Sequence, residues 1–556
     1  MDPYKRLIRA ARGVTPADAV FSDAEIFNPF TCRWNHGSLA IKDGVILGIG
    51  DYEGSREINT EGAYLVPGLI DAHVHIESSL LLPREYAALV ARHGTAAVIA
   101  DPHEIANVAG SAGINYMLAE RFGLPVDIRY LVPSCVPSTP ADIGGAVIGA
   151  EECRRFKGDG GVLGLGEMMD VPGILAGEPG IREKLEIFAI RDGHAPQLSG
   201  KDLNAYILSG LQSDHECTHL AEAEEKLNLG MYIYIREGST EQNIDELASL
   251  ITPTTAPRCC FATDDCHADL LMEDGHIDRC IRKAIACGVE PELAIRVATL
   301  SAAERFGLTG HGALSPGRSA DFCVIDDPER FTVRDVFVGG RPLQTFRIAV
   351  RQGNSIPFPF RCTVPANESL SVCGKGPARV IGLVPNQIVT DSLLVDCNGA
   401  GVPDIPRDIL KVVVCNRYGT GSCATGLVHG FGFKKGAIAS TVSHDAHNLI
   451  ATGVKDSDII NAITAVIHMK GGMAAVSGER HAYLPLDCAG LMSSLPYKEV
   501  VKRIRALHRM TSTMGGINDP FMYLSFLSLT VVPALRITDR GVFDCAVFRD
   551  VPLFTG

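Results

Sequence analysis

Short apolar stretches alternate with helical stretches eight times between residues 65 and 310. Such alternation is typical of a parallel sheet, in which each strand returns through a helix to lie beside the previous one. Eight strand–helix units in about 250 residues predict a (β/α)8 barrel, whose active side chains follow the strands at one face. The predicted strands are 65–70, 96–100, 128–132, 162–165, 188–190, a strand ending at 214, 231–235 and 259–262.

Two further regions flank the predicted barrel. From Asp18 to Ala63 short apolar strands are broken by turns, and Asp43–Gly44 is a hairpin signal. A β pattern returns around Gly310, and we expect that segment to complete a discontinuous small N-terminal β domain. The last region mixes strands and helices and predicts an α+β domain. The predicted domains are 1–65 completed by 311–365, 66–310 for the barrel, and 366–556.

The composition narrows the class of protein. A hydrophobic content of 46% and a charged content of 21% predict a large folded core. The net charge of -14 argues against binding to nucleic acid. The chain shows no leader pattern at its start and no apolar run of about 18 residues, so we expect no membrane segment. Its 17 cysteines include no Cys-x-x-Cys pair, which favours reduced thiols in a cytoplasmic protein.

The apolar run that holds the first predicted barrel strand ends in two histidines, His73 and His75. Residues two apart in a strand point to the same side, so both imidazoles can reach one metal ion. Further potential ligands follow later strands. The full set is His73, His75, Glu167, His194, His215 and Asp264. Imidazoles mixed with carboxylates suit zinc, iron or manganese.

Such a set could hold two divalent ions with Glu167 between them. Two ions that share a bound water lower its pKa and make a hydroxide available at neutral pH. Asp264 could take the proton of the attacking water and pass it to the leaving group, as a general acid–base. The neighbouring Asp265 is an alternative ligand at the same strand end.

Longer segments around these residues resemble the adenine deaminase family of the amidohydrolase superfamily. Residues 67–75 are similar to the opening of the superfamily's barrel, and residues 73–79 narrow the resemblance to the adenine deaminases of bacteria and archaea. The other barrel segments that resemble the family are 100–108, 166–170, 192–196, 213–218 and 263–265. In the C-terminal region they are 443–448, 470–473, 489–493 and 527–533, so the resemblance covers nearly the whole chain.

The resemblance implies a metallo-dependent hydrolase barrel that attacks C6 of adenine with water and releases ammonia and hypoxanthine, as in purine salvage. It implies two divalent ions, manganese or iron, with zinc as a further option. The implied ligands are His73, His75 and Asp264 on one ion and His194 and His215 on the other, with Glu167 shared. Glu167 and Asp264 are the implied catalytic residues. One departure is the short segment between Glu178 and His194, which leaves little room for a helix before the fifth strand.

A second group of polar residues is expected to bind the substrate or to support the metal ligands. These candidates are Glu77, His103, Glu104, Arg236, Glu237, His444, Asp445 and His447. The three C-terminal members could reach over the barrel mouth, bind an extra metal or cap a local turn. The expected partner is adenine alone, without nucleic acid or membrane, and we expect a homo-oligomer, a dimer.

Three other functions remain open for this sequence. The chain could be another cyclic amidohydrolase that cleaves a ring amide or an N-acyl group. It could also be a metal-bound scaffold without catalysis, although the complete ligand set argues against that. His215–His219 reads His-Glu-x-x-His, which is typical of zinc proteases when both histidines lie on one helix. We expect His215 at a strand end and His219 at the start of the next helix.

Overall fold

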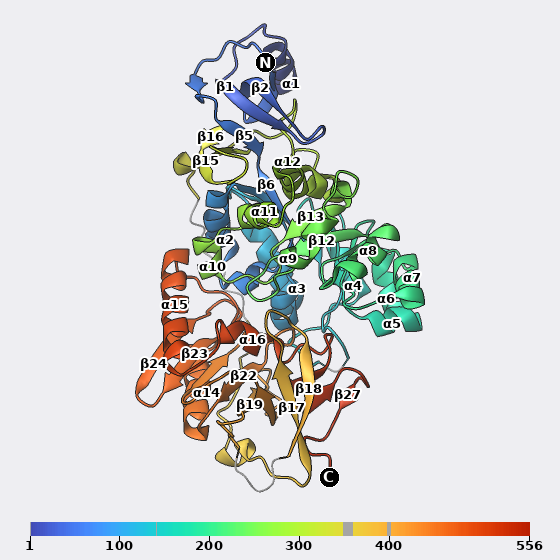
Figure 1. Ribbon diagram of the computed structural model, residues 1–556, viewed down its shortest axis with the longest axis vertical. Helices are drawn as coiled ribbons and strands as arrows, with labels where there is room; N and C mark the ends of the chain where they lie inside the picture. Colours follow the sequence, from blue (N-terminus) through green and yellow to red (C-terminus); the bar gives the residue numbers. More distant parts are fainter. Residues whose placement is uncertain (1, 141, 349–357, 359, 397–401) are drawn as a thin grey trace.

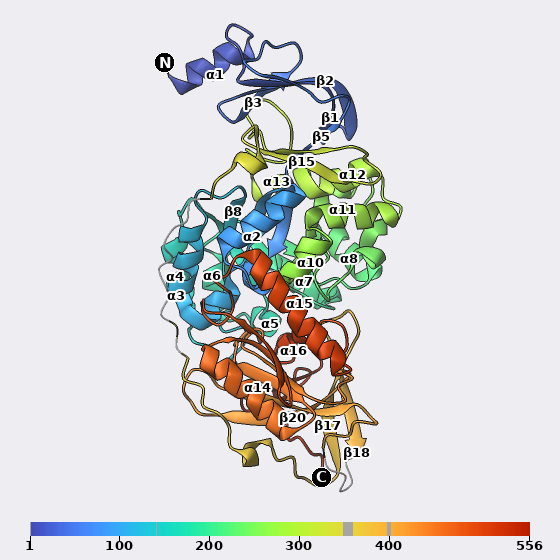
Figure 2. The same ribbon diagram turned by 90° about the vertical axis from the view of Figure 1, so that its left-hand side faces the viewer.

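The computed structural model describes residues 2–140, 142–348, 358, 360–396 and 402–556. The molecule is elongated and has three parts stacked along its long axis (Figures 1 and 2). A small β part carries the N-terminus at one tip, α/β elements fill the middle, and a β-rich part lies at the end that carries the C-terminus (Figure 1). Within the described residues, no helix combines the length and the apolar character needed to cross a membrane.

The N-terminal part is built around one mixed sheet. Its strand order is β16-β15-β14-β5-β1-β2-β3, with β4 paired to β1. The strands are β1 (Ala19–Asn28), β2 (Arg33–Lys42), β3 (Val45–Ile49), β4 (Glu57–Asn59), β5 (Tyr64–Pro67), β14 (Phe322–Ile325), β15 (Val333–Val338) and β16 (Arg341–Pro342). Because β14 pairs antiparallel with β5, residues on either side of the central part share this sheet. The domain boundaries stay a prediction, and residues 349–357 and 359 of the predicted 311–365 segment lie outside the described residues.

Eight parallel strands form the central barrel. They are β6 (Leu69–Val74), β7 (Thr95–Ala100), β8 (Asp127–Val132), β9 (Val162–Met168), β10 (Arg191–Gly193), β11 (Ser213–Asp214), β12 (Tyr232–Arg236) and β13 (Cys259–Ala262). Strands β6 to β10 form one sheet and β11 to β13 another. A parallel bridge between Val74 and Asp264 joins the first strand to the last. The predicted α/β barrel is therefore confirmed.

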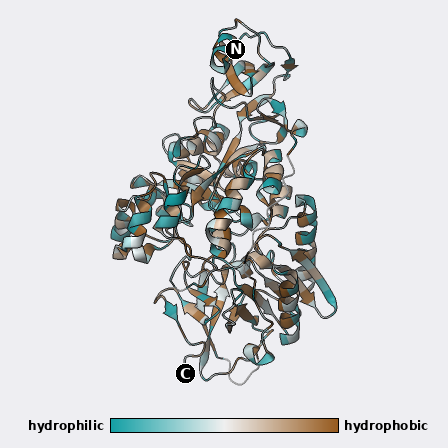
Figure 3. Ribbon diagram, turned by 180° about the vertical axis from the view of Figure 1, so that it is seen from behind, coloured by the Kyte–Doolittle hydropathy of each residue, from teal (hydrophilic) through white to brown (hydrophobic). Residues whose placement is uncertain are grey.

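The sequence explains why these strands are central. Every residue of β6, β7 and β13 is buried, as expected for strands covered on both faces. The surrounding helices include α2 (Pro83–Val90), α3 (His103–Glu120), α7 (Gly200–Leu208), α8 (Leu220–Asn228) and α11 (Ile277–Ala286). Hydrophobic residues gather on the central strands, whereas the peripheral helices carry more hydrophilic ones (Figure 3).

Two predictions about the fifth barrel unit are wrong. The fifth strand is Arg191–Gly193 rather than 188–190. The apolar signal began at Phe188, which is buried in a hydrophobic core without joining a strand. The segment before the strand does hold a helix, α6 (Pro179–Leu185), which follows α5 (Val171–Ala176). Helices of only six and seven residues fit where the sequence left little room.

The C-terminal part contains an eight-stranded mixed sheet in the order β18-β17-β20-β19-β22-β21-β23-β24. The strands are β17 (Pro377–Leu383), β18 (Thr390–Asp396), β19 (Ile409–Cys415), β20 (Cys423–His429), β21 (Ala437–Ser440), β22 (Leu449–Gly453), β23 (Gly472–Ser477) and β24 (Arg480–Pro485). Helix α14 (Asp456–Met469) packs on this sheet, and α15 (Tyr497–Thr513) spans from β24 to barrel helix α10 (Ala268–Glu273). Helix α16 (Pro520–Phe526) precedes a small sheet of β25 (Leu535–Thr538), β26 (Gly541–Asp544) and β27 (Arg549–Asp550). The connection from β21 to β22 runs toward the barrel.

Candidate metal centre and active site

His73, near the end of β6, and His75, just after it, face the same point. Nε2 of His73 lies 3.2 Å from Nε2 of His75. The two Nε2 atoms lie 3.4 Å and 3.1 Å from Oδ1 of Asp264, which follows β13. All three side chains are buried. The bridge between β6 and β13 therefore brings ligands from the first and last barrel strands together.

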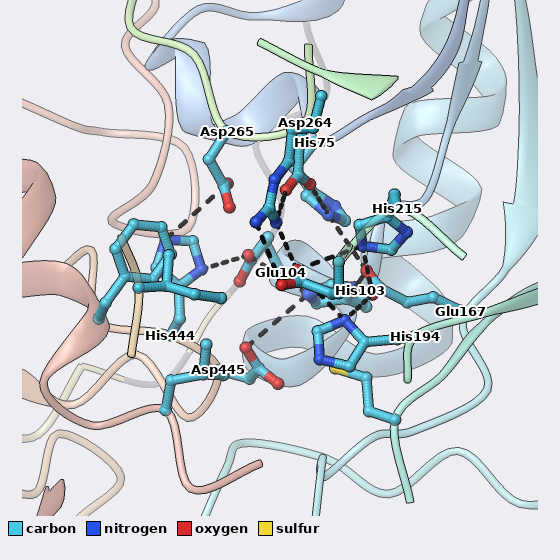
Figure 4. Close-up of a pocket in the computed structure, with 16 residues that line it drawn as sticks. His75, His103, Glu104, Glu167, His194, His215, Asp264, Asp265, His444 and Asp445 are labelled. Atoms are coloured by element: carbon cyan, nitrogen blue, oxygen red, sulfur yellow. Dashed lines mark hydrogen bonds and ion pairs between the residues drawn. The ribbon is translucent and has the colours of Figure 1, made fainter. Parts of the chain in front are cut away.

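Glu167, near the end of β9, divides its two carboxylate oxygens between two groups of histidines. Its Oε1 lies 3.6 Å from His73 Nε2 and 3.2 Å from His75 Nε2. Its Oε2 lies 2.8 Å from His194 Nδ1 and 3.2 Å from His215 Nε2. The carboxylate thus lies between the imidazoles of His73 and His75 and another pair that follows β10 and β11. Figure 4 shows Glu167 with His75, His194 and His215 around it.

Hydrogen bonds between neighbouring strand ends hold these candidate ligands in place. The backbone N–H of Glu167 donates to Asp101 Oδ2 at 2.9 Å, which ties β9 to the end of β7. The backbone N–H of His194 donates to the Tyr206 hydroxyl at 2.8 Å, and that hydroxyl donates to the carbonyl of Met168 at 2.9 Å. The ends of β9 and β10 are therefore held by one buried tyrosine.

The donor atoms fit metal ions. Ligands about 2.0–2.2 Å from one ion lie about 3–3.5 Å from each other, close to the separations found here. Nδ1 of His75 donates to the carbonyl of Asp101 at 2.9 Å, so its Nε2 keeps a lone pair aimed at the cluster. Burial lowers the pKa of His73, but Asp264 and Glu167 outweigh it and raise the pKa to about 10. The same carboxylates favour a divalent cation at this point.

Asp264 is held on both sides. Its Oδ2 accepts a hydrogen bond from Arg236 Nη1 at 2.9 Å, while its Oδ1 faces the two β6 histidines. Its backbone φ of 54° lies in the left-handed region, which non-glycine residues seldom adopt and which is enriched at functional sites. Arg236 also forms a bidentate ion pair with Glu216. The guanidinium therefore leaves one Asp264 oxygen free to face the cluster.

Asp265 lines the same pocket but contacts other side chains than Asp264 does. Ser78 donates a hydrogen bond to its Oδ1, and the same oxygen lies 3.9 Å from His444 Nε2. Of the two neighbouring aspartates, Asp264 is the one whose carboxylate approaches His73 and His75. The geometry supports the predicted preference for Asp264 over Asp265 as the ligand.

A loop from the C-terminal part reaches the barrel mouth. His444 and His447, between β21 and β22, both contact the carboxylate of Glu104, one at each oxygen. Burial raises the pKa of Glu104, but the two histidines outweigh it and bring the pKa well below the usual value. His103 Nε2 lies 3.8 Å from Asp445 Oδ1, and its Nδ1 lies 3.4 Å from Glu167 Oε1. His103 thus stands between the metal ligands and the C-terminal loop (Figure 4).

The structure separates the supporting candidates into two groups. His103, Glu104, Arg236, His444 and Asp445 line the pocket at the barrel mouth. His447 lies behind them, where Glu104 holds it.

Glu77 and Glu237 are buried beside the pocket without lining it. Glu77 accepts a hydrogen bond from the backbone N–H of Ile105 at 3.1 Å. Glu237 pairs with Lys283 at 2.7 Å. Glu237 is therefore paired away from the candidate metal ligands, whereas Oε2 of Glu77 is buried without a hydrogen-bond partner.

Some residues at the site were absent from the sequence prediction. Oε1 of Glu216 lies 3.6 Å from both His194 Nδ1 and His215 Nε2, and its position directly after His215 was the available signal. Apolar side chains close the pocket, namely Met169, Ile388, Phe526 and Leu529. Phe526 stacks on the His444 ring with centroids 4.8 Å apart. Ile388, Phe526 and Leu529 lie far from the barrel in sequence. Nothing in the sequence distinguishes them from ordinary apolar core residues.

The structure does not place the two histidines of the protease pattern on one helix. Helix α8 begins at Leu220, and His219 is its exposed N-cap, whereas His215 is buried at the strand end. The two histidines of the His-Glu-x-x-His sequence therefore lie on different elements, as predicted.

Comparison with known proteins shows which family this chain belongs to. The Amidohydrolase family model matches residues 64–343, and the Adenine deaminase C-terminal domain model matches residues 387–549. The chain is 61% identical over 553 residues to an adenine deaminase of Methanoregula boonei, which covers 99% of both chains. The chain belongs to the adenine deaminase family. Adenine deaminases of Methanoculleus marisnigri and Desulfatibacillum aliphaticivorans are 56% and 42% identical over 93% and 99% of this chain, and the alignments cover 99% of each relative.

Membership of the adenine deaminase family confirms the resemblance predicted from the sequence. The amidohydrolase match over the barrel makes the chain a metal-dependent hydrolase. The family implies a divalent metal, and groups of buried histidines and carboxylates that could hold one lie at the barrel mouth. The Adenine deaminase C-terminal domain model matches residues 387–549, and this match includes the loop that carries His444 and His447.

Proposed function

We propose that this chain converts adenine and water to hypoxanthine and ammonia. The observation that carries the proposal is the 61% identity over 99% of the chain to a protein named adenine deaminase. The site supports it, because four histidines and two carboxylates meet at the barrel mouth, the face at which such barrels carry out chemistry.

Six residues would hold two divalent ions. His73, His75 and Asp264 would bind one, His194 and His215 the other, and Glu167 would bridge them through its two oxygens. Manganese or iron is the proposed metal, with zinc as a further option, because histidine and carboxylate ligands suit all three. When bound, such a pair supplies a water whose pKa is low enough for attack at neutral pH.

Asp264 is proposed to move the proton. Its Oδ1 lies at the centre of the cluster, where it can accept a proton from the attacking water and deliver it to the departing amine. Arg236 holds the other oxygen, which fixes the direction of the carboxylate. Glu167 is proposed to assist Asp264 by holding the reacting groups in place between the two histidine pairs.

The C-terminal loop is proposed to complete the purine pocket. Adenine has flat apolar faces and a polar edge. Phe526 and Leu529 offer apolar surface, and His444 and Asp445 offer polar groups beside it. Oδ2 of Asp445 and Nε2 of His444 are buried without a hydrogen-bond partner, which suits contacts with a bound base. The remaining supporting candidates, Glu77 and Glu237, are proposed to hold the loops behind the site.

A panel of substrates tests this proposal against the alternatives. Protein loaded with manganese is incubated with adenine, with a cyclic ring amide such as hydantoin, and with an N-acyl amino acid. Release of ammonia and hypoxanthine from adenine alone supports the proposal. Hydrolysis of one of the other two compounds instead would make the chain a different amidohydrolase, and no turnover of any would favour a metal-bound scaffold. The homodimer and the cytoplasmic location stay predictions, and light scattering of the purified protein measures the first.

A further inference from the structure

Two cysteines face each other where β19 ends and β20 begins. Cys415 is the last residue of β19, Cys423 is the first residue of β20, and the two are directly paired across the antiparallel strands. Their sulfur atoms lie 3.1 Å apart. Cys362 borders the pair, since its thiol interacts with that of Cys415. None of these thiols belongs to the metal centre.

The backbone register at this pair suits a covalent link. The N–H of Asn416 donates to the carbonyl of Ser422 at 2.9 Å, so the next pair inward, Cys415 with Cys423, is of the non-hydrogen-bonded type. Residues in such a pair have Cα atoms about 4.5 Å apart, which falls within the range of about 4.4–6.8 Å that disulfides span. A bond between the two sulfurs requires them to approach from 3.1 Å to about 2.0 Å.

The two thiols differ in access and acidity. Cys415 is buried, whereas Cys423 is half-buried. Hydrogen bonding with Cys362 and with Cys423 raises the pKa of Cys415, and hydrogen bonding with Cys415 lowers the pKa of Cys423. Cys423 is therefore the thiol that a small molecule reaches first as a thiolate, the reactive form.

The turn between the two strands contacts the active-site loop. Arg417 is buried in this turn, and its Nη1 donates to the carbonyl of His447 at 3.3 Å. The Tyr418 hydroxyl donates to the carbonyl of Ala446 at 2.6 Å. The backbone N–H of Arg417 donates to Asn448 Oδ1 at 3.1 Å. Three hydrogen bonds therefore connect this turn to the loop that carries His444 and His447.

We propose that Cys415 and Cys423 form a reversible disulfide that displaces the 416–422 turn and, through it, the active-site loop. The oxidant is a small-molecule disulfide, RSSR. The Cys423 thiolate attacks RSSR, forms a mixed disulfide and releases one RS⁻. The Cys415 thiol then loses its proton, attacks the Cys423 sulfur and releases the second RS⁻. The protein loses two electrons and two protons, and RSSR becomes two RSH.

The cross-link is tested on the full-length protein loaded with zinc, which is redox-inert. Oxidised glutathione is added, and peptide mapping by mass spectrometry locates any disulfide. The expected product is a Cys415–Cys423 link without bound glutathione, which dithiothreitol reverses. Cys362→Ser is expected to form the same link, and Cys423→Ser is expected to form none. A Cys362–Cys415 link, or no link at any glutathione concentration, overturns the proposed pair.

Two readouts test the effect on the site. Hydrogen exchange of residues 441–448 is expected to change on oxidation in the wild type and to stay unchanged in Cys423→Ser; unchanged exchange in the cross-linked wild type overturns the coupling. This readout does not depend on the substrate.

The second readout rests on the proposed function. Adenine turnover is expected to fall about tenfold on oxidation, because small displacements of positioning groups are costly, and to recover on reduction. Full activity in the cross-linked protein overturns the coupling. If the reduced protein does not turn over adenine, the proposed function fails. Peptide mapping and hydrogen exchange then still test the proposed disulfide and its coupling to the loop.

Discussion

Glu167 Oε2 lies 2.8 Å from His194 Nδ1, while the other oxygen of the same carboxylate faces the histidines of β6. This contact joins ligands from strands that are far apart in the sequence. It also places one carboxylate where two ions would share it. The consequences can be measured through metal content, turnover and stability.

Replacing Glu167 by Gln is expected to abolish the shared ligand while preserving the side-chain volume. Bound metal should fall from two ions per chain to one or fewer, and kcat for adenine should fall at least about 1,000-fold, because both histidine pairs lose the carboxylate between them. Elemental analysis and ammonia release measure the two effects. Glu186→Gln, on the barrel exterior, is a matched control that should retain both properties. A near-normal rate in Glu167→Gln would refute the bridging role.

Asp264→Asn and Asp265→Asn separate the two neighbouring aspartates. Asp264→Asn should lose turnover by at least about 1,000-fold, since the amide cannot accept the proton in the same way. Asp265→Asn should lose less than about tenfold, because Asp265 contacts Ser78 and His444 rather than the two histidines beside Asp264. Steady-state kinetics with adenine measure both, and circular dichroism verifies that both variants fold. The reverse order of effects would assign the ligand to Asp265.

His194→Ala is expected to reduce bound metal by about one ion per chain. Its imidazole contacts Glu167 at the same oxygen as His215, so its loss removes half of that histidine pair. His219→Ala is the matched control, because His219 is exposed at the start of α8 and should leave the metal content unchanged. Elemental analysis of both variants distinguishes them. Metal loss in His219→Ala but not in His194→Ala would instead support the zinc-protease arrangement of the His-Glu-x-x-His sequence.

His508 is expected to make the contact between the barrel and the C-terminal part depend on pH. Burial lowers the pKa of His508, but Asp269 and Asp519 outweigh it and raise the pKa to about 10. The unfolded pKa is about 6.5, so the stabilisation is complete below about pH 6.5 and is lost as the pH rises through about 10. The melting temperature of His508→Gln should therefore lie below that of the wild type at pH 6 and approach it above pH 10.

Thermal unfolding followed by circular dichroism measures this difference across pH. His468→Gln, an exposed histidine at the end of α14, is the control and should match the wild type throughout. A gap between His508→Gln and the wild type that persists unchanged above pH 10 would contradict the assignment.

The barrel was predictable because its signals are local. Buried parallel strands are continuous apolar runs, and the candidate ligands lie at or just beyond their ends, so His73 and His215 could be located from those ends. The fifth strand was misplaced because Phe188 is apolar for a different reason, namely burial in the core without a strand partner. Periodicity over three residues cannot distinguish the two cases.

The walls of the pocket were not predictable from local signals. Glu104 and His447 are 343 residues apart, and no pattern within either segment indicates that they touch. Phe526 likewise reaches His444 only because α16 packs against the sheet that carries the loop. Contacts of this kind depend on how two folded units dock, which sequence periodicity does not encode.

Metal titration of the apoprotein tests the central claim most directly. Metal is removed with a chelator under reducing conditions, manganese is added in steps, and hypoxanthine formation from adenine is measured at each step. We predict that activity rises with added metal and reaches its plateau at two equivalents per chain. A plateau at one equivalent, or no hypoxanthine at any amount of manganese, iron or zinc, would contradict a two-metal adenine deaminase.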